Sequence, residues 1–91
     1  MGAESRETRL RRVRMRATHR GIREMDVILS RFIAGNLDGM DAAALDRFEA
    51  LLGENDHDLF AWVAGRRPAP ARHAALIAEI AREAGHGDIG V

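Results

Sequence analysis

The chain has 91 residues, of which 46% are hydrophobic and 31% charged, enough for one domain with a modest core. It contains no cysteine, which excludes disulfides, thiolate zinc sites and cysteine nucleophiles from this sequence. No apolar run approaches the roughly 20 residues of a membrane span, and the start lacks the pattern of a secretory signal. We therefore expect a small cytoplasmic protein whose fold depends on packing.

The formal net charge is zero, but the charges are separated along the chain. Residues 1–23 contain eight arginines and two glutamates, whereas residues 24–91 contain six arginines and twelve acidic residues. This separation predicts a basic end that is available to an acidic partner, such as nucleic-acid phosphates. No phenylalanine, tyrosine or tryptophan stands among the arginines of residues 6–23 to stack on bases. A basic helical nucleic-acid-binding protein is therefore the alternative rather than the leading interpretation.

The first half of the chain shows two stretches with helical spacing. Residues 6–17 have a narrow apolar stripe among arginines, which predicts a short basic helix with a flexible, basic start over residues 1–8. Residues 21–34 have a wider stripe, which predicts a helix buried on one side. This stripe consists of Ile22, Met25, Ile28, Leu29, Phe32 and Ile33.

The second half predicts three more helices, after a turn at residues 35–39. Asp41 is placed to cap a helix that ends at Gly53, and Asn55 or Asp56 can cap a short helix that stops near Gly65. A last helix over residues 71–84 ends at Gly85, and residues 86–91 form a loose tail. The predicted core positions of these helices are Leu45, Phe48, Leu51, Leu52, Leu59, Phe60, Trp62, Val63, Leu76, Ile77, Ile80 and Ala84.

No segment alternates apolar and polar residues for long enough to predict a strand. The expected fold is all-α, a small single-domain bundle of about five short helices with its helical domain at residues 9–85.

Patterns for cofactors, metals and catalysis are weak. Residues 85–90 spell G-x-G-x-x-G, but a helix precedes them and only one residue follows, so the strand and helix that make this a dinucleotide site are missing. The four histidines lie on separate elements without a second ligand at metal-binding spacing. We predict no catalytic, metal or cofactor-binding residue.

The stretch "THRGIREMD", residues 18–26, is the least ordinary part of the chain. A helical wheel puts Arg20, Glu24, Val27 and Arg31 opposite the apolar stripe, where Arg20 and Glu24 can pair across one turn. Gly21 costs a helix about 1 kcal/mol if it is inside it. At a junction the same glycine supplies a left-handed turn or admits a second backbone.

The stretch "RGIREMDVILSRF" resembles the R-G-x-x-E signature of the bacterial SdhE family of flavinylation factors, which is related to the mitochondrial succinate dehydrogenase assembly factors. Further along, "LDRFEALLGENDHDLFAWVAG" is similar to a second stretch of that family, a phenylalanine and leucines followed by acids, an aromatic residue and tryptophan. The resemblance covers roughly residues 9–65.

This resemblance implies a bacterial cytoplasmic assembly factor, not an enzyme, that promotes covalent FAD attachment to the succinate dehydrogenase flavoprotein subunit. In some relatives the client is also the fumarate reductase flavoprotein. The factor acts on the client's FAD and binds none stably itself, and we expect a monomer. The matching positions assign partner binding to Arg20, Gly21, Arg23, Glu24, Met25 and Asp26.

Overall fold

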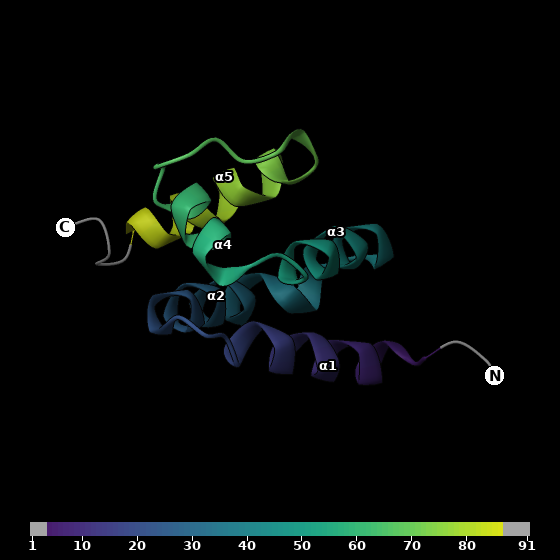
Figure 1. Cartoon of the computed structure of the whole chain (residues 1–91). Coiled ribbons are helices and arrows are strands. Elements are labelled where there is room, and N and C mark those ends of the chain that lie inside the picture. Colours follow the sequence, from purple (N-terminus) through teal and green to yellow (C-terminus); the bar gives the residue numbers. More distant parts are fainter. Residues whose placement is uncertain (1–3, 87–91) are drawn as a thin grey trace.

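The computed structural model describes residues 4–86, which form five α-helices and one 3₁₀ turn (Figure 1). The described residues include no strand, and the predicted all-α fold is confirmed. The elements in chain order are α1 (Arg6–Thr18), α2 (Arg23–Asn36), η1 (Leu37–Gly39), α3 (Ala42–Leu52), α4 (Asp56–Val63) and α5 (Ala71–His86).

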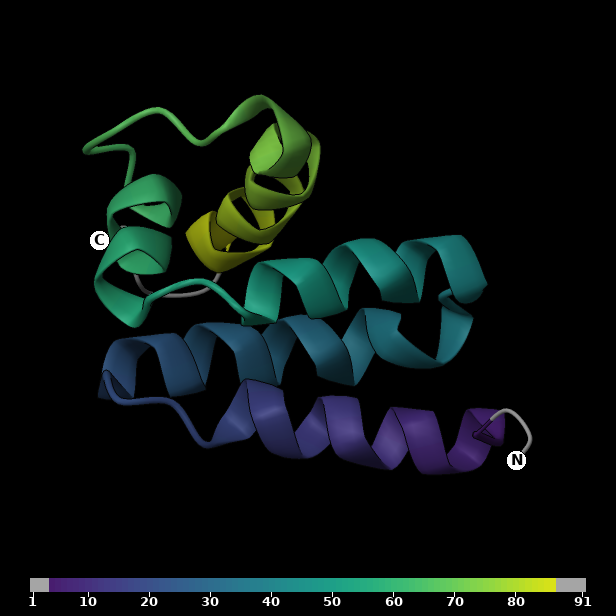
Figure 2. The ribbon, with the colours of Figure 1, turned by 45° about the vertical axis from the view of Figure 1, so that its right-hand side comes forward.

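Helix α2 is the centre of the bundle. It packs against α1, η1, α4 and α5, while α3 contacts both α1 and α5. Figure 2 shows α1, α2 and α3 lying side by side, with α4 and α5 above them. The connection between α1 and α2 therefore lies at one end of the three-helix layer.

The core contains most of the apolar positions that the helical spacing predicted, while Ile22, Phe60, Val63 and Leu76 are only partly buried and pack against it. In α2 the five residues Met25, Ile28, Leu29, Phe32 and Ile33 are buried, and α3 buries Leu45, Phe48, Leu51 and Leu52. Helix α1 buries only Val13 and Ala17. Leu37 is fully buried as well, because the segment predicted as a turn continues α2 to Asn36 and then winds into η1.

The predicted helix caps are present. The Asp41 side chain accepts a hydrogen bond from the backbone N–H of Ala44 at 2.8 Å, and that of Asn55 accepts one from His57 at 2.7 Å. Gly65 has φ +77°, the left-handed conformation that is typical of the residue that ends a helix, here α4. The caps fix where α3 and α4 begin, and so where the loop between them lies.

Three predicted boundaries differ. Helix α1 begins at Arg6 with Ser5 as its N-cap, so residues 6–8 are helical rather than a flexible start. Helix α2 begins at Arg23, two residues later than expected. Gly85 does not end α5, which continues to His86. The rest of the predicted loose tail and of the G-x-G-x-x-G pattern lies outside the described residues.

None of the helices described here is both long and apolar enough to cross a membrane.

Candidate docking site at the connection between α1 and α2

Gly21 lies in the connection between two helices and not inside one. Ile22 is the N-cap of α2 in extended conformation, so the helical cost of glycine does not apply. Within residues 4–86 Gly65 is the one glycine with positive φ, so Gly21 does not provide a left-handed turn either. A Cβ atom added to Gly21 would lie 3.1 Å from Oδ2 of Asp56. A larger residue here would press on the Asp56 carboxylate, which would have to shift by a few tenths of an ångström.

Arg20 faces inward, and the predicted exposed pair of Arg20 with Glu24 is wrong. Arg20 precedes α2, so the one-turn spacing that would bring the two side chains together does not exist. Its side chain is 11% exposed, and its Nε donates to Oδ1 of Asp56 at 2.6 Å. Arg20 therefore connects the segment between α1 and α2 to the first residue of α4.

The Arg20 guanidinium also binds backbone carbonyls at the ends of two helices. Nη1 donates to the carbonyl of Leu52 at 2.9 Å and to that of Arg16 at 3.3 Å. Nη2 donates to the backbone carbonyl of Glu54 at 3.0 Å. The last turns of α1 and α3 leave such carbonyls without helical partners and carry partial negative charge. One cation thus stabilises the carboxyl ends of both helices.

Two carboxylates bind the backbone of the connection. The N–H of Arg20 donates to Oδ1 of Asp26 at 2.7 Å, and the N–H of Gly21 donates to Oδ2 of Asp56. Asp26, predicted to meet a partner, is therefore already engaged within the fold. Met25 is 1% exposed and belongs to the core, so its side chain is not displayed on the surface of this structure.

Three of the six predicted residues remain displayed. Gly21, Arg23 and Glu24 are exposed, and the side chains of Arg23 and Glu24 make no hydrogen bond or ion pair with any described residue. Val27 follows one turn later at 39% exposure, one of two large apolar side chains exposed in residues 4–86. The contacts of Arg20, Met25 and Asp26 fix the backbone that carries the three displayed residues.

The basic start of the chain is largely neutralised in space. Arg9 lies 2.6 Å from both Asp46 and Glu49, and Glu49 also accepts hydrogen bonds from Arg12 at 2.9 Å. Burial raises the Glu49 pKa, but the hydrogen bonds from Arg9 and Arg12 outweigh it and the pKa is lowered. The expectation of an available basic end is therefore wrong for these arginines, which leaves less free charge for nucleic-acid phosphates.

His73 is a buried polar residue that sequence reasoning missed. It is 3% exposed, its Nε2 lies 2.8 Å from Oε2 of Glu54, and its ring centre lies 5.9 Å from that of Trp62. Hydrogen bonds from His73 and then from Arg72 lower the pKa of Glu54. The helical spacing of His73 with Ile77 and Ile80 on the inner face of α5 was the available signal that this histidine is buried. The described residues contain no group of three side chains able to hold a metal.

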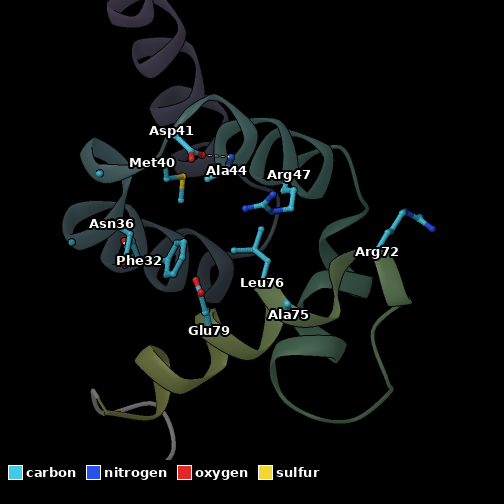
Figure 3. Close-up of a pocket in the computed structure, with 12 residues that line it drawn as sticks. Phe32, Asn36, Met40, Asp41, Ala44, Arg47, Arg72, Ala75, Leu76 and Glu79 are labelled. Atoms are coloured by element: carbon cyan, nitrogen blue, oxygen red, sulfur yellow. Dashed lines mark hydrogen bonds between the residues drawn. The ribbon is translucent and has the colours of Figure 1, made fainter.

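One hollow lies away from the connection, between the end of α2, α3 and α5 (Figure 3). It is open, with a volume of ≈ 510 Å³. Small residues leave the space, Phe32 and Leu76 form apolar wall, and Arg47 and Glu79 bring opposite charges to it. It has neither a metal-ligand group nor a glycine-rich phosphate loop. We assign the candidate site to the connection.

Comparison with known proteins places the sequence of this chain in a family. The family model described as "Flavinator of succinate dehydrogenase" matches residues 11–84. The chain is 42% identical over 72 residues to the mitochondrial succinate dehydrogenase assembly factor 2 of Mycosarcoma maydis, covering 79% of this chain and 30% of that protein. It is 39% identical over 66 residues to the FAD assembly factor SdhE of Acetobacter pasteurianus, covering 72% of this chain and 61% of that protein.

A third relative, the mitochondrial succinate dehydrogenase assembly factor 2 of Schizosaccharomyces pombe, is 35% identical over 69 residues, covering 76% of this chain and 50% of that protein. The matched segments thus span less than two thirds of each of these relatives. All three relatives are named as assembly factors and not as enzymes, in agreement with the sequence-based expectation. The chain belongs to the family of flavinators of succinate dehydrogenase.

Proposed function

We propose that this protein binds the flavoprotein subunit of succinate dehydrogenase and promotes the covalent attachment of its FAD. One observation carries the proposal. Gly21 in the connection and Arg23 and Glu24 in the first turn of α2 are exposed, whereas the other motif residues are fixed inside the fold. The family match and the names of the relatives support the same client.

The exposed residues suit a protein partner more than a small molecule. Gly21 has no side chain, so a client backbone can approach it closely. Arg23 and Glu24 present opposite charges in consecutive positions, which sets the orientation of a partner with the complementary arrangement. Val27 adds apolar area next to them. We place the first contact with the client at these residues.

The protein assists the reaction by ordering its client. Joining a flavin to a protein side chain requires both reactants and the charge-stabilising groups to be held in reactive geometry. A factor that binds this arrangement more tightly than the others raises its population without touching the reacting atoms. In this proposal the FAD stays with the client, and the fumarate reductase flavoprotein is a second client served in the same way in the bacterial cytoplasm.

Co-expression with a succinate dehydrogenase flavoprotein subunit tests the proposal. Covalent flavin is read by fluorescence in a denaturing gel, with the wild-type chain, without it, and with the double variant Arg23→Ala/Glu24→Ala. We expect more covalent flavin with the wild type only. If the wild type adds no covalent flavin to any flavoprotein subunit offered, the proposal is wrong and the family membership describes the fold alone.

A further inference from the structure

Asp56 binds the α1–α2 connection from a distant part of the chain. It is the first residue of α4, 35 positions after Gly21, and its side chain is 16% exposed. One carboxylate oxygen accepts from the Arg20 guanidinium at 2.6 Å, and the other accepts from the N–H of Gly21. At this burial, water competes weakly for such charge-assisted hydrogen bonds.

The connection depends on these carboxylates for its conformation. The backbone N–H groups of Arg20 and Gly21 donate to side-chain carboxylates, those of Asp26 and Asp56 respectively, and to no described backbone carbonyl. Glycine has the widest range of backbone conformations of any residue. Asp26 fixes the connection only to its own helix α2, and the Arg20 guanidinium binds the end of α3. Asp56 is the carboxylate that fixes the backbone of the connection relative to α4.

We propose that Asp56 is a positioning residue of the docking site, selecting the conformation of the connection in which Gly21, Arg23 and Glu24 meet the client together. Asp56 itself does not touch the client. This inference rests on the proposed function and adds a residue outside the R-G-x-x-E stretch to it. It also explains why residue 21 is tightly constrained from inside the fold, since a Cβ there would lie 3.1 Å from Asp56.

The chain contains a matched control for Asp56. Asp58 is the other acidic residue in the first turn of α4, so both residues interact with the positive end of the same helix. Asp58 pairs with Arg67 at 2.5 Å and makes no hydrogen bond to the connection among the described residues. Asp56→Asn and Asp58→Asn remove the same charge from the same helix end, but only the first replaces an acceptor of Gly21 with an amide.

The experiment measures three quantities on wild type and both variants: the melting temperature, the amide exchange rate of Gly21 by NMR, and covalent flavin on the co-expressed flavoprotein. For Asp56→Asn we expect Gly21 to exchange about tenfold faster, as loss of a hydrogen bond of about 1.4 kcal/mol implies. Covalent flavin at limiting factor concentration should fall about fivefold or more. For Asp58→Asn, the Gly21 exchange rate and the amount of covalent flavin should both stay within about twofold of the wild-type values.

Raising the concentration of Asp56→Asn should restore covalent flavin, because a positioning defect lowers only the fraction of molecules competent to dock. A folded Asp56→Asn with unchanged Gly21 exchange, or with faster exchange and unchanged flavin at limiting concentration, overturns the inference. If Asp56→Asn does not fold, Asp56→Glu keeps the charge with a longer side chain and is judged by the same two criteria. Failure of the wild type to add flavin would instead reject the proposed function, while Gly21 exchange still reports on Asp56.

Discussion

The Oε2 atom of Glu49 on α3 lies 2.6 Å from the Nε atom of Arg9 on α1, although 40 residues separate them. The same carboxylate accepts two hydrogen bonds from Arg12 at 2.9 Å and lies 3.5 Å from Arg16. Three arginines that are spread along α1 thus meet one acid on α3. This contact joins the basic and acidic parts of the sequence in space.

Glu49→Gln should destabilise the fold by about 1 kcal/mol at pH 7, because the hydrogen bonds from Arg9 and Arg12 lose their charged acceptor and Arg16 loses its ion-pair partner. The lowered pKa of Glu49 means that its contribution is complete above the unfolded-state pKa and disappears as the pH falls through the folded-state value. Denaturant unfolding at pH 7 and near pH 3 should therefore show a difference between variant and wild type that shrinks in acid. Asp46→Asn, at a 71% exposed side chain, should show a smaller difference at both pH values.

Arg20→Ala should lower the free energy of unfolding by about 2–4 kcal/mol, since it leaves Oδ1 of Asp56 and three backbone carbonyls without their arginine donor. Arg23→Ala removes the same side chain from an exposed position and should change it by less than about 0.5 kcal/mol. Denaturant unfolding of both variants decides the matter. Equal effects would mean that the Arg20 contacts contribute nothing net.

Gly21→Arg should abolish client flavinylation. The new side chain starts 3.1 Å from the Asp56 carboxylate, which must yield, and then occupies the surface where the client backbone is proposed to pass. Gly39→Arg is the matched control, because a Cβ at Gly39 meets nothing within 4 Å. Covalent flavin in co-expression and circular dichroism of the purified variants are the measurements. A folded Gly21→Arg that supports normal flavin attachment would remove Gly21 from the docking site.

Glu24→Ala should reduce covalent flavin while leaving the free energy of unfolding within about 0.5 kcal/mol of wild type, because Glu24 has no ion pair in the described structure. Glu7→Ala is a suitable comparison, since both glutamates are exposed and stand in the first turn of a helix. It should leave flavin attachment unchanged. A loss of stability greater than about 2 kcal/mol in Glu24→Ala would assign this residue a structural role instead.

Helical spacing was sufficient to predict the all-α fold and most of the core, because burial on one side of a helix repeats every three to four residues. It could not predict the role of Arg20. Its partners Leu52, Glu54 and Asp56 are more than 30 residues away and meet it only after α3 and α4 have packed. The same limit applies to His73, whose partner Glu54 lies 19 residues away in the loop between α3 and α4.

Leu37 was missed for a local reason. Two glycines and an aspartate surround it, and such a composition is typical of turns. The chain nevertheless continues from α2 into η1, which turns this one apolar side chain into the core. Composition thus described the surroundings correctly and left out the residue that packs.

Helix α1 contributes only Val13 and Ala17 to the buried core, with Leu10 partly buried against it, and is also attached through arginines at its surface. In local opening equilibria, the element with the least buried apolar area separates first while the rest remains folded. Salt weakens surface ion pairs and leaves apolar packing in place. The amide protons of α1 should then exchange before those of α2, and faster at high salt. Because α1 leads directly into the connection that contains Gly21, each local opening of α1 would also disrupt the docking site.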